Sequence, residues 1–417
     1  MTSQPPNLIQ SSELPPAQPD YVLRGHTAQI HCVHFLRQNL RLLTGDADGW
    51  VALWNFAVKR PVAVWKAHGG SVLGVGSWGA EEENIITWVR INAGWVWIVW
   101  LTAHRHGRDN KLLVWQLREA DEKTFSKVLP IDDATTKRKQ PWLLHSLDVN
   151  ALNFCSFAMS HMPPPPLSPT EDNATAPTNP AQPSILVAVP GVQDGLISIT
   201  ALPATTRFAT IPPPKDTSTG MLMAVSLHYP PDATSPLVAA GYESGHVALW
   251  RHNMTTNRWE TSYLHKSHSQ PVLSLDMAPS IGCFFSSSAD AIVTRHPLLG
   301  DGETETKVLQ TKHAGQQSLS VRGDGKVFAT AGWDGRVRVY AAKGLKELAV
   351  LKWHKEGCYA TAFAEILEDK LEASPNGDGT VARRELTVAQ QRAFKSQSTH
   401  WLAAGSKDGK VSLWDIY

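Results

Sequence analysis

The stretch that most constrains the fold is Leu42–Trp54, which has the pattern of two strands joined by a tight turn. Asp48 and Gly49 form the turn signal, because glycine adopts positive φ angles without a Cβ clash. Val51 and Leu53 alternate with other residues after the turn, and this period of two is typical of a β-strand. A single unit of this kind predicts an ordinary hairpin.

Copies of this unit recur throughout the 417-residue chain. A small residue, a tight-turn signal and alternating apolar residues, most often with a closing aromatic residue, return in six further segments: Arg108–Trp115, Gln193–Ile199, Ala240–Trp250, Ser286–Val293, Thr330–Tyr340 and Ala404–Asp415. The unit resembles the WD40 repeat, whose period of about 40–45 residues marks one four-stranded blade of a β-propeller. Seven units therefore predict an all-β fold, a single seven-bladed WD40 propeller over residues 20–417.

Histidines upstream of most turns predict a polar network in each blade. The resemblance to WD40 repeats implies hydrogen bonds among this His, a Ser or Thr, the turn Asp and the closing Trp. The residues assigned to these networks are His26, Thr44, Asp48 and Trp54 in the first blade, Asp109 and Trp115 in the second, His313, Thr330 and Asp334 in the sixth, and Asp408 and Trp414 in the seventh. A His/Ser/Asp set could also be a catalytic charge relay, but a nucleophile is not needed seven times. We expect buried structural networks and no catalytic residue.

The two ends of the chain are predicted to close the ring. Val411–Trp414 has the pattern of the third strand of the last blade, and the chain ends shortly after it, so that blade lacks an outer strand. Tyr21–Arg24 has the composition of a short strand and can supply the missing one, which also removes a free sheet edge. We expect these two segments to pair.

Composition argues against several kinds of partner. Apolar residues make up 42% and charged residues 18% of the chain, and the net charge is +1 at pH 7. A near-neutral chain lacks the basic surface of a dedicated nucleic-acid or membrane protein, although a local patch is not excluded. The cysteines, Cys32, Cys155, Cys283 and Cys358, form no CxxC pair, so neither a zinc site nor a disulfide framework is predicted. We expect a reduced intracellular compartment and no cofactor.

Several segments depart from the repeat. Residues 1–19 are rich in proline without periodicity and are predicted to be a disordered tail. The insertions 118–140, 159–183 and 365–399 lengthen a third-to-fourth strand connection in blade two and first-to-second connections in blades three and seven. Because strand connections alternate between the two faces of a propeller, we expect all three on the face opposite the Asp-Gly turns. The last insertion is predicted to carry a short helix at Leu386–Lys395.

The insertion 88–105 interrupts blade two and holds four of the sixteen tryptophans. It is too short and too interrupted for a membrane helix, while an extra strand on the blade is one interpretation. Removing it restores a normal blade turn, and the codons for Thr87-Trp88 and His104-Arg105 permit GT and AG splice signals. We therefore hypothesise that 88–105 is a translated intron. Sequencing of cDNA is expected to yield transcripts without it, and transcripts that all retain it would contradict the hypothesis.

Large aromatic residues at the turns are the candidate partner-binding residues. Trp50 follows the turn of the first blade, Trp333 precedes the Asp of the sixth, and Tyr242 lies in the turn of the fourth. Arg108 and Arg336 would belong to a polar rim around them. Exposed aromatic residues anchor protein interfaces, but the same residues could instead pack on neighbouring loops. The sequence leaves both interpretations open.

The sequence also resembles a particular family. The segments Leu14–Pro19, Leu23–His26, Leu42–Trp54, Arg60–His68, His106–Trp115 and Ala404–Tyr417 resemble the fungal ASTRA-associated protein 1 family. This resemblance implies a nuclear WD40 scaffold subunit of the ASTRA complex, linked to chromatin remodelling, with the cytoplasm as a second location. The implied partners are a Tel–Tti assembly, the phosphatidylinositol-3-kinase-like kinases that it matures, and RuvB-like ATPases. The sequence contains no Walker, GxSxG, HExxH or Rossmann motif that would indicate an enzyme.

The main alternative is a substrate receptor of a cullin-4 ubiquitin ligase. Such receptors carry a Trp-Asp-x-Arg ending on a blade. Trp115–Arg118 lacks the Asp, and Trp414–Tyr417 lacks the Arg. The match is therefore poor, and the scaffold interpretation is preferred.

Overall fold

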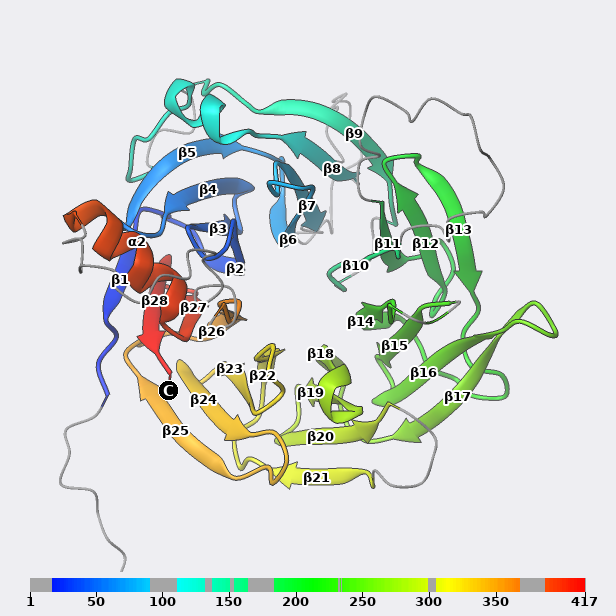
Figure 1. Ribbon diagram of the computed structural model, residues 1–417. Coiled ribbons are helices and arrows are strands. Elements are labelled where there is room, and N and C mark those ends of the chain that lie inside the picture. The colour runs from blue at the N-terminus through cyan, green and yellow to red at the C-terminus, as the bar shows by residue number, and fades with distance from the viewer. Residues whose placement is uncertain are drawn as a thin grey trace, which may run out of the picture.

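The strands of the computed structural model form a closed ring of radial sheets (Figure 1). Seven sheets of four strands each surround the centre, one for each repeat unit of the sequence. The expectation of an all-β, seven-bladed propeller is therefore confirmed. The structure describes residues 17–90, 111–131, 137–150, 154–163, 184–231, 233, 235–298, 305–367 and 387–416.

The first four blades take their strands in chain order from the centre outwards. Blade one contains β2 (Ile30–Leu36), β3 (Arg41–Asp46), β4 (Trp50–Asn55) and β5 (Arg60–Lys66), and blade two contains β6 (Ser71–Trp78), β7 (Asn84–Arg90), β8 (Lys111–Gln116) and β9 (Trp142–Asp148). Blade three contains β10 (Ala158–His161), β11 (Ile185–Pro190), β12 (Ile197–Leu202) and β13 (Thr206–Ile211), and blade four contains β14 (Leu222–His228), β15 (Leu237–Tyr242), β16 (His246–Asn253) and β17 (Arg258–Lys266).

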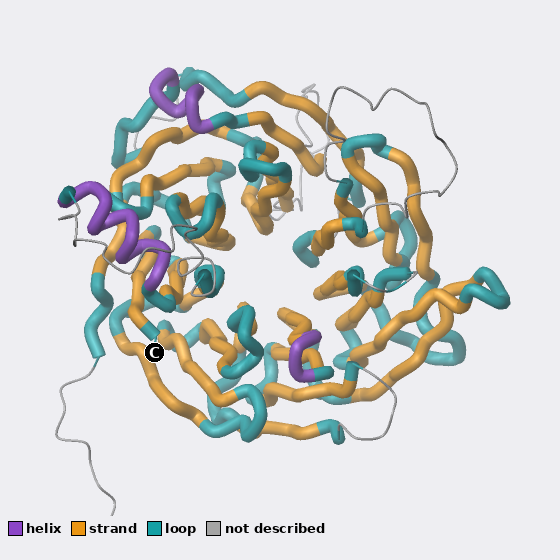
Figure 2. The backbone as a smooth tube through the Cα atoms, in the orientation of Figure 1, coloured by secondary structure: helices purple, strands orange, loops and turns teal. Residues whose placement is uncertain are grey.

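The last three blades complete the ring. Blade five contains β18 (Val272–Ala278), β19 (Cys283–Ser288), β20 (Ile292–Pro297) and β21 (Lys307–Gln310), and blade six contains β22 (Gln316–Val321), β23 (Val327–Gly332), β24 (Arg336–Ala341) and β25 (Glu347–Lys352). Blade seven joins both ends of the chain, with β26 (Cys358–Phe363), β27 (Trp401–Ser406), β28 (Lys410–Asp415) and β1 (Tyr21–Arg24). Figure 2 shows one helical segment at the rim, one over the strands of blade seven, and the short 3-10 helix η2 (Pro279–Ile281) towards the inside of the ring.

Small residues near the end of the second strand let neighbouring blades pack closely. A Cβ atom added to Gly241 would lie 2.4 Å from Val272 in the next blade, and one added to Gly405 would lie 2.5 Å from Ile30. Such distances are too short for any larger side chain, because interiors are packed at crystal-like density. The small residue of the repeat unit is therefore required by contact between blades.

Blade two departs from this rule at Trp88. Trp88 follows Thr87 as Gly45 follows Thr44 in blade one, and its ring is fully buried opposite Gly74 of β6. The indole Nε1–H has no hydrogen-bond partner among the described residues. Residues 91–105 of the hypothetical intron lie outside the described part of the chain, so that hypothesis stays a prediction.

The ring is closed by β1 and β28, as the sequence predicts. The two strands are antiparallel, with Tyr21 opposite Leu413 and Arg24 opposite Lys410. Leu23 of β1 is buried in the cluster of apolar side chains that joins blades seven and one. The strand β1 therefore serves as the outer strand of the last blade.

The insertion 118–140 begins on the predicted face. Its first turn is the 3-10 helix η1 (Glu119–Thr124), which lies beside the connection between β2 and β3. The guanidinium of Arg41 lies 2.8 Å from a carboxylate oxygen of Glu119 and 2.8 Å from one of Glu122. Arg41 and Glu122 are both buried, so part of this charged segment belongs to the interior.

The rest of this insertion crosses to the other face, which corrects the expectation that it would stay opposite the Asp-Gly turns. The backbone N–H of Val64 in β5 donates to the carbonyl of Ser126 at 2.9 Å, so the insertion runs along the outer edge of blade one. Farther on, the N–H of Ile131 donates to the carbonyl of Gly25 at 2.9 Å. Strand connections alternate between the two faces when they are short. The insertion 118–140 is long enough to run along the edge strand β5, whose main-chain groups need hydrogen-bond partners, and so it reaches the other face.

The other insertions also differ in detail from the sequence-based expectation. Met159–His161 belong to β10, so the insertion predicted at 159–183 begins later, and its residues 164–183 lie outside the described part of the chain. The predicted helix at Leu386–Lys395 is instead α2 (Val388–Ser398). Its start is fixed by a capping box in which Thr387 accepts from the backbone of Gln390.

Helix α2 lies on the face opposite the Asp-Gly turns, as expected for the insertion 365–399. The amide of Asn39, in the connection between β2 and β3, donates to the carbonyl of Glu365 at 2.7 Å. Lys395 of α2 lies 3.2 Å from Asp20, just before β1. The helix is therefore anchored where blade seven meets blade one (Figure 1). Residues 1–16 and 368–386 lie outside the described residues.

Three further properties of the chain bear on possible sites. None of the helices in the described ranges is long and apolar enough to cross a membrane. The same part of the chain contains no group of three or more His, Cys, Asp or Glu side chains placed to hold a metal ion. The four cysteines are buried and form no disulfide bond in the described part of the chain, and burial raises the pKa of each thiol.

Candidate protein-binding surface

The turn of blade one is held by a buried network around His26. Its Nδ1 lies 2.6 Å from Asp46 Oδ2, and its Nε2 lies 2.8 Å from Thr44 Oγ1. The indole N–H of Trp54 donates to the same Thr44 oxygen at 2.9 Å. The structure thus brings together three of the four residues that the sequence assigns to this network.

The fourth predicted residue, Asp48, is not in the network. Its side chain is exposed, and Asp46 takes its place at the end of β3. The other oxygen of Asp46 accepts from the backbone N–H groups of Asp48 and Trp50 at 3.0 and 2.9 Å. Two carboxylates cannot share one buried imidazole without like-charge repulsion, so the second carboxylate points to water. The signal in the sequence that would have identified Asp46 is its position in the repeat unit, where two other blades have Ser288 and Ser406.

Blade two contains a similar set. His68 Nε2 lies 2.7 Å from Thr87 Oγ1, and the indole N–H of Trp115 donates to that oxygen at 2.9 Å. The structure therefore places the predicted Trp115 in a network. The predicted Asp109 lies outside the described residues.

Blade seven builds its network with a hydroxyl from another strand. His354 Nε2 lies 2.9 Å from Ser412 Oγ, and the indole N–H of Trp414 donates to Ser412 at 2.8 Å. Asp408 Oδ2 lies 3.3 Å from His354 Nδ1. The predicted Asp408 and Trp414 therefore meet, and Ser412 of β28 supplies the hydroxyl because Ala404 occupies the position on β27.

Blade five has a network that the sequence analysis missed. Ser286 Oγ lies 2.7 Å from His268 Nε2 and 2.8 Å from His296 Nε2, so His296 stands where other blades have Trp. Asp290 Oδ1 lies 3.3 Å from His268 Nδ1. Burial lowers the pKa of both imidazoles, which keeps them neutral at pH 7. The signal in the sequence that could have predicted this network is His296, which occupies the position of the closing Trp in the repeat unit.

Blade six corrects the predicted set of His313, Thr330 and Asp334. The side chain of His313 is 44% exposed, and its Nδ1 is 3.8 Å from Asp334 Oδ2. The buried guanidinium of Arg338 binds Asp334 instead, with Nη2 2.6 Å from Oδ2. Partial burial of the Asp334 carboxyl acts to raise its pKa, but the bound Arg338 guanidinium holds this pKa below its ordinary value. A guanidinium offers a fork of donors to a carboxylate, which explains why the imidazole is displaced. Thr330 is buried but takes no hydrogen bond from His313.

These networks hold turns, and in blades one, two and five the central hydroxyl group lies away from solvent. Thr44, Thr87 and Ser286 are fully buried, so no substrate can reach their hydroxyl groups in this structure. The charge-relay interpretation has no geometric support at these positions. What the networks do provide is a rigid set of Asp-Gly turns on one face of the ring.

Trp50 is not an exposed anchor, which corrects its assignment as a candidate partner-binding residue. Its side chain is only 4% exposed. The guanidinium carbon of Arg138, from the insertion 118–140, lies 5.0 Å from the centre of the indole ring, and Lys66 Nζ lies 5.3 Å from it. The insertion that crosses to this face therefore covers Trp50.

Tyr242 is also buried, which corrects a second assignment. Tyr242 is the last residue of β15, as Asp46 is the last residue of β3 in blade one. At this position the side chain points into the interior. Tyr242 packs in one apolar cluster with Trp250, and its burial raises the pKa of the phenol. Apolar packing thus takes the place of the polar network in blade four.

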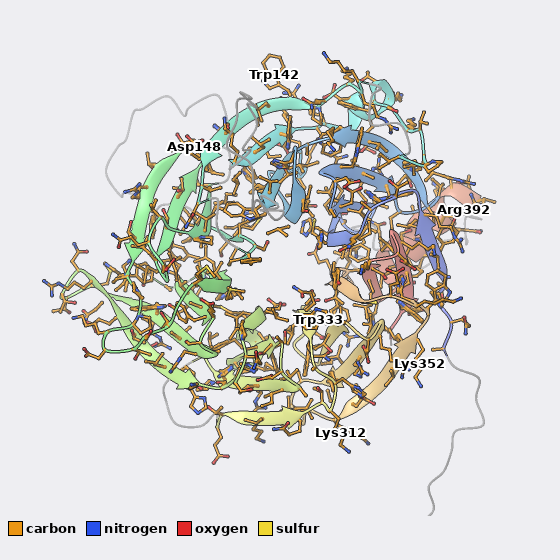
Figure 3. All side chains as sticks on the ribbon, turned by 180° about the vertical axis from the view of Figure 1, so that it is seen from behind. Trp142, Asp148, Lys312, Trp333, Lys352 and Arg392 are labelled. Carbon is orange, nitrogen blue, oxygen red and sulfur yellow. The ribbon has the colours of Figure 1, made fainter. Side chains whose placement is uncertain are left out.

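Trp333 is the candidate that the structure leaves open to solvent. Its side chain is 47% exposed in the turn between β23 and β24. One face of the indole lies against Gly315, where an added Cβ atom would be 2.2 Å from the ring, and the indole N–H donates to Gln317 Oε1 at 2.8 Å. Figure 3 shows Trp333 near the inner edge of the ring, whereas Trp142 points outwards from the rim.

Exposed cations border Trp333. Arg336 is exposed two residues beyond the turn Asp, as predicted for a polar rim. The loop whose Gly357 adjoins the Trp333 backbone exposes Lys355 together with Glu356, whereas Lys312 lies at the outer rim of the ring, away from Trp333 (Figure 3). The predicted Arg108 lies outside the described residues. Trp333, Arg336 and Lys355 form what is called below the Trp333 surface.

Comparison with known proteins agrees with this architecture. The family model "WD domain, G-beta repeat" matches residues 17–55, 305–341 and 392–415. A protein of Aspergillus flavus named "ASTRA-associated protein 1" is 46% identical over 438 residues, covering 97% of this chain and 98% of its own. The chain belongs to the ASTRA-associated protein 1 family. The resemblance found in the sequence is thereby confirmed.

Relatives of the same name extend across fungi. The Aspergillus niger protein is 45% identical over 460 residues and covers 100% of both chains. The Schizosaccharomyces pombe protein is 28% identical over 439 residues, with 96% of this chain and 99% of its own covered. Family members are therefore similar along the whole propeller, including blades that the WD40 model does not match.

Proposed function

We propose that the chain is a non-catalytic scaffold subunit of the ASTRA complex and that the Trp333 surface binds a protein partner. The observation that carries the proposal is Trp333, half exposed yet fixed by Gly315 and Gln317. An aromatic side chain that is already ordered loses little entropy on binding, which suits an interface anchor. The name of its relatives, ASTRA-associated protein 1, supports the choice of complex.

The finer parts of this proposal rest on the family resemblance. The proposed partners are the Tel–Tti assembly, a phosphatidylinositol-3-kinase-like kinase and the RuvB-like ATPases. The proposed roles are the maturation of these kinases and chromatin remodelling. The nucleus is the proposed location, with the cytoplasm as a second. The Trp333 surface exposes aromatic and basic side chains on one face of the ring. The sequence contains no recognisable catalytic motif. Together these two observations favour a role in assembly over a role in catalysis.

Trp333→Ala is expected to weaken the recovery of these partners from a fungal nuclear extract. Loss of an anchoring aromatic residue costs about 2 kcal/mol or more, roughly 30-fold in affinity. A tagged chain is isolated at moderate salt, and the amounts of Tel–Tti proteins and RuvB-like ATPases are measured by quantitative mass spectrometry.

Trp142→Ala is the matched control, because Trp142 is 73% exposed but lies on the outer rim in β9. Both variants should keep the thermal transition of the natural chain, since neither side chain is buried. Recovery of a cullin-4 adaptor in place of these partners would move the assignment to a ubiquitin-ligase receptor. Equal recovery by Trp333→Ala and the natural chain would exclude the Trp333 surface as the docking site.

A further inference from the structure

A groove runs along the seam where the ring closes. Its volume is about 840 Å³, and it lies between β1 of blade seven and β5 of blade one, with the insertion 118–140 as a further wall. A smaller hollow of about 130 Å³ adjoins it, shares Tyr21 and Lys59 with it, and reaches α2. The two together are called the seam groove. They lie at a different place from the Trp333 surface.

Cations dominate the lining of the seam groove. Six line it: Arg24, Lys59, Arg60, Lys127, Arg392 and Lys395. Among the described lining residues the one carboxylate is Asp20, which is paired with Lys395 at 3.2 Å. The chain as a whole has 39 Lys and Arg against 38 Asp and Glu, so this local excess does not follow from composition. A concave surface of one charge attracts a ligand of the opposite charge.

Half of these cations are free to bind. Arg24, Arg60 and Lys127 are exposed and form no ion pair within the described ranges. Figure 3 shows Arg392 on the outer side of the ring. Surface cations usually sit among carboxylates of the same chain, which neutralise them. Here the positive charge is left for a partner.

Lys59 is the most constrained of the six. Its Nζ lies 3.1 Å from the ring centre of Phe56 and 4.6 Å from that of Trp401, and it donates to the carbonyl of Phe56 at 2.7 Å. Burial and the nearby charge of Lys395 lower its pKa to about 7, against the opposing effect of Asp20. An incoming carboxylate would stabilise this half-buried ammonium group.

The shape of the groove favours an extended chain. Both β1 and β5 are the outer strands of their sheets. The insertion already pairs with β5 at Val64, so β1 is the strand along which a peptide can be added. Tyr21, 40% exposed, contributes an apolar surface together with Leu129 and Pro61. An edge strand can pair with an extended peptide through its main chain, while flanking pockets select side chains.

We propose that the seam groove binds an extended, Asp- and Glu-rich segment of a partner protein. The chain's own tail is a poor occupant, because residues 1–19 contain Glu13 as their one carboxylate. A nucleic acid is disfavoured because the positive charge is confined to one groove in a chain of net charge +1. The proposal is independent of the Trp333 surface, since it can be tested with the purified chain alone.

The test is a titration of the purified full chain into a fluorescein-labelled peptide of about ten Asp and Glu residues, followed by fluorescence anisotropy. We expect binding that weakens with added salt, because the contacts are charged and partly exposed. The double variant Arg60→Glu/Lys127→Glu is expected to weaken binding about tenfold or more. The control is Lys343→Glu/Lys346→Glu, which makes the same change in net charge on exposed residues of blade six.

Three results would overturn the proposal. The first is an absence of peptide binding by the natural chain, or an equal loss in both double variants. The second is equal competition by single-stranded DNA of the same charge, which would indicate a general polyanion site. The third is at least tenfold tighter peptide binding after deletion of residues 368–386, which would identify this acidic segment of the chain as the occupant. Retention of affinity by the control variant, with loss in the groove variant, would support the proposal.

Discussion

Asp46→Ala is expected to lower the free energy of unfolding by about 3–5 kcal/mol. The substitution leaves the buried Nδ1 of His26 without its partner at 2.6 Å. It also removes the acceptor of two backbone N–H groups in the turn, those of Asp48 and Trp50. Buried polar groups that lose their partners keep the full cost of leaving water. The change is measured as a shift of the urea midpoint at constant slope.

Asp48→Ala is the matched control for this prediction. It removes a carboxylate two residues away in the same turn, but one that is exposed and outside the network. We expect a change within about 0.5 kcal/mol. The repeat pattern alone predicts the reverse order, because it assigns Asp48 to the network. A larger loss for Asp48→Ala than for Asp46→Ala would show that the turn of blade one is built as in the pattern.

The comparison of these two residues shows what a repeat pattern can predict. The pattern located the turn, both strands and three of the four network residues, because these depend on spacing along the strand. The choice between Asp46 and Asp48 depends on which carboxylate lies near His26 in the folded turn, and spacing along the strand does not specify this. Blade six makes the same point, since Arg338 reaches Asp334 from the adjacent strand.

Exposure was harder to predict than fold, for a related physical reason. The sequence proposed three turn aromatics, and Trp333 is the one that stays half exposed. Trp50 is covered by Arg138, which is distant in sequence and arrives with an insertion whose path the pattern does not specify. Tyr242 points inwards because it ends a strand rather than following it. The seam groove was missed for the same reason, because its cations come from separate segments that meet only after the ring closes.

Removal of β1 is expected to be the second large effect. A chain that begins at Gly25 loses the four-residue strand that pairs with β28. The loss of Leu23 burial costs about 2 kcal/mol, and each lost backbone hydrogen bond costs roughly 0.5–1.5 kcal/mol. With about four such bonds lost along the four paired positions, the total is roughly 4–8 kcal/mol, a large part of the stability of a typical domain. It is measured as a lower urea midpoint, together with light scattering, because the bare edge of β28 can pair with other molecules.

Two further chains separate the role of β1 from that of the tail. A chain that begins at Asp20 keeps β1 and should unfold at the same urea concentration as the full chain. A third chain begins at Gly25 and carries Tyr21–Arg24 after residue 417, joined by a short linker with an Asn-Gly turn. The added segment can pair antiparallel to β28 as the outer strands of the other blades pair with their neighbours. Recovery of the urea midpoint in this third chain would show that the ring needs the strand and not its connection to the N-terminus. Equal midpoints for the chains that begin at Asp20 and Gly25 would contradict the closure of the ring by β1.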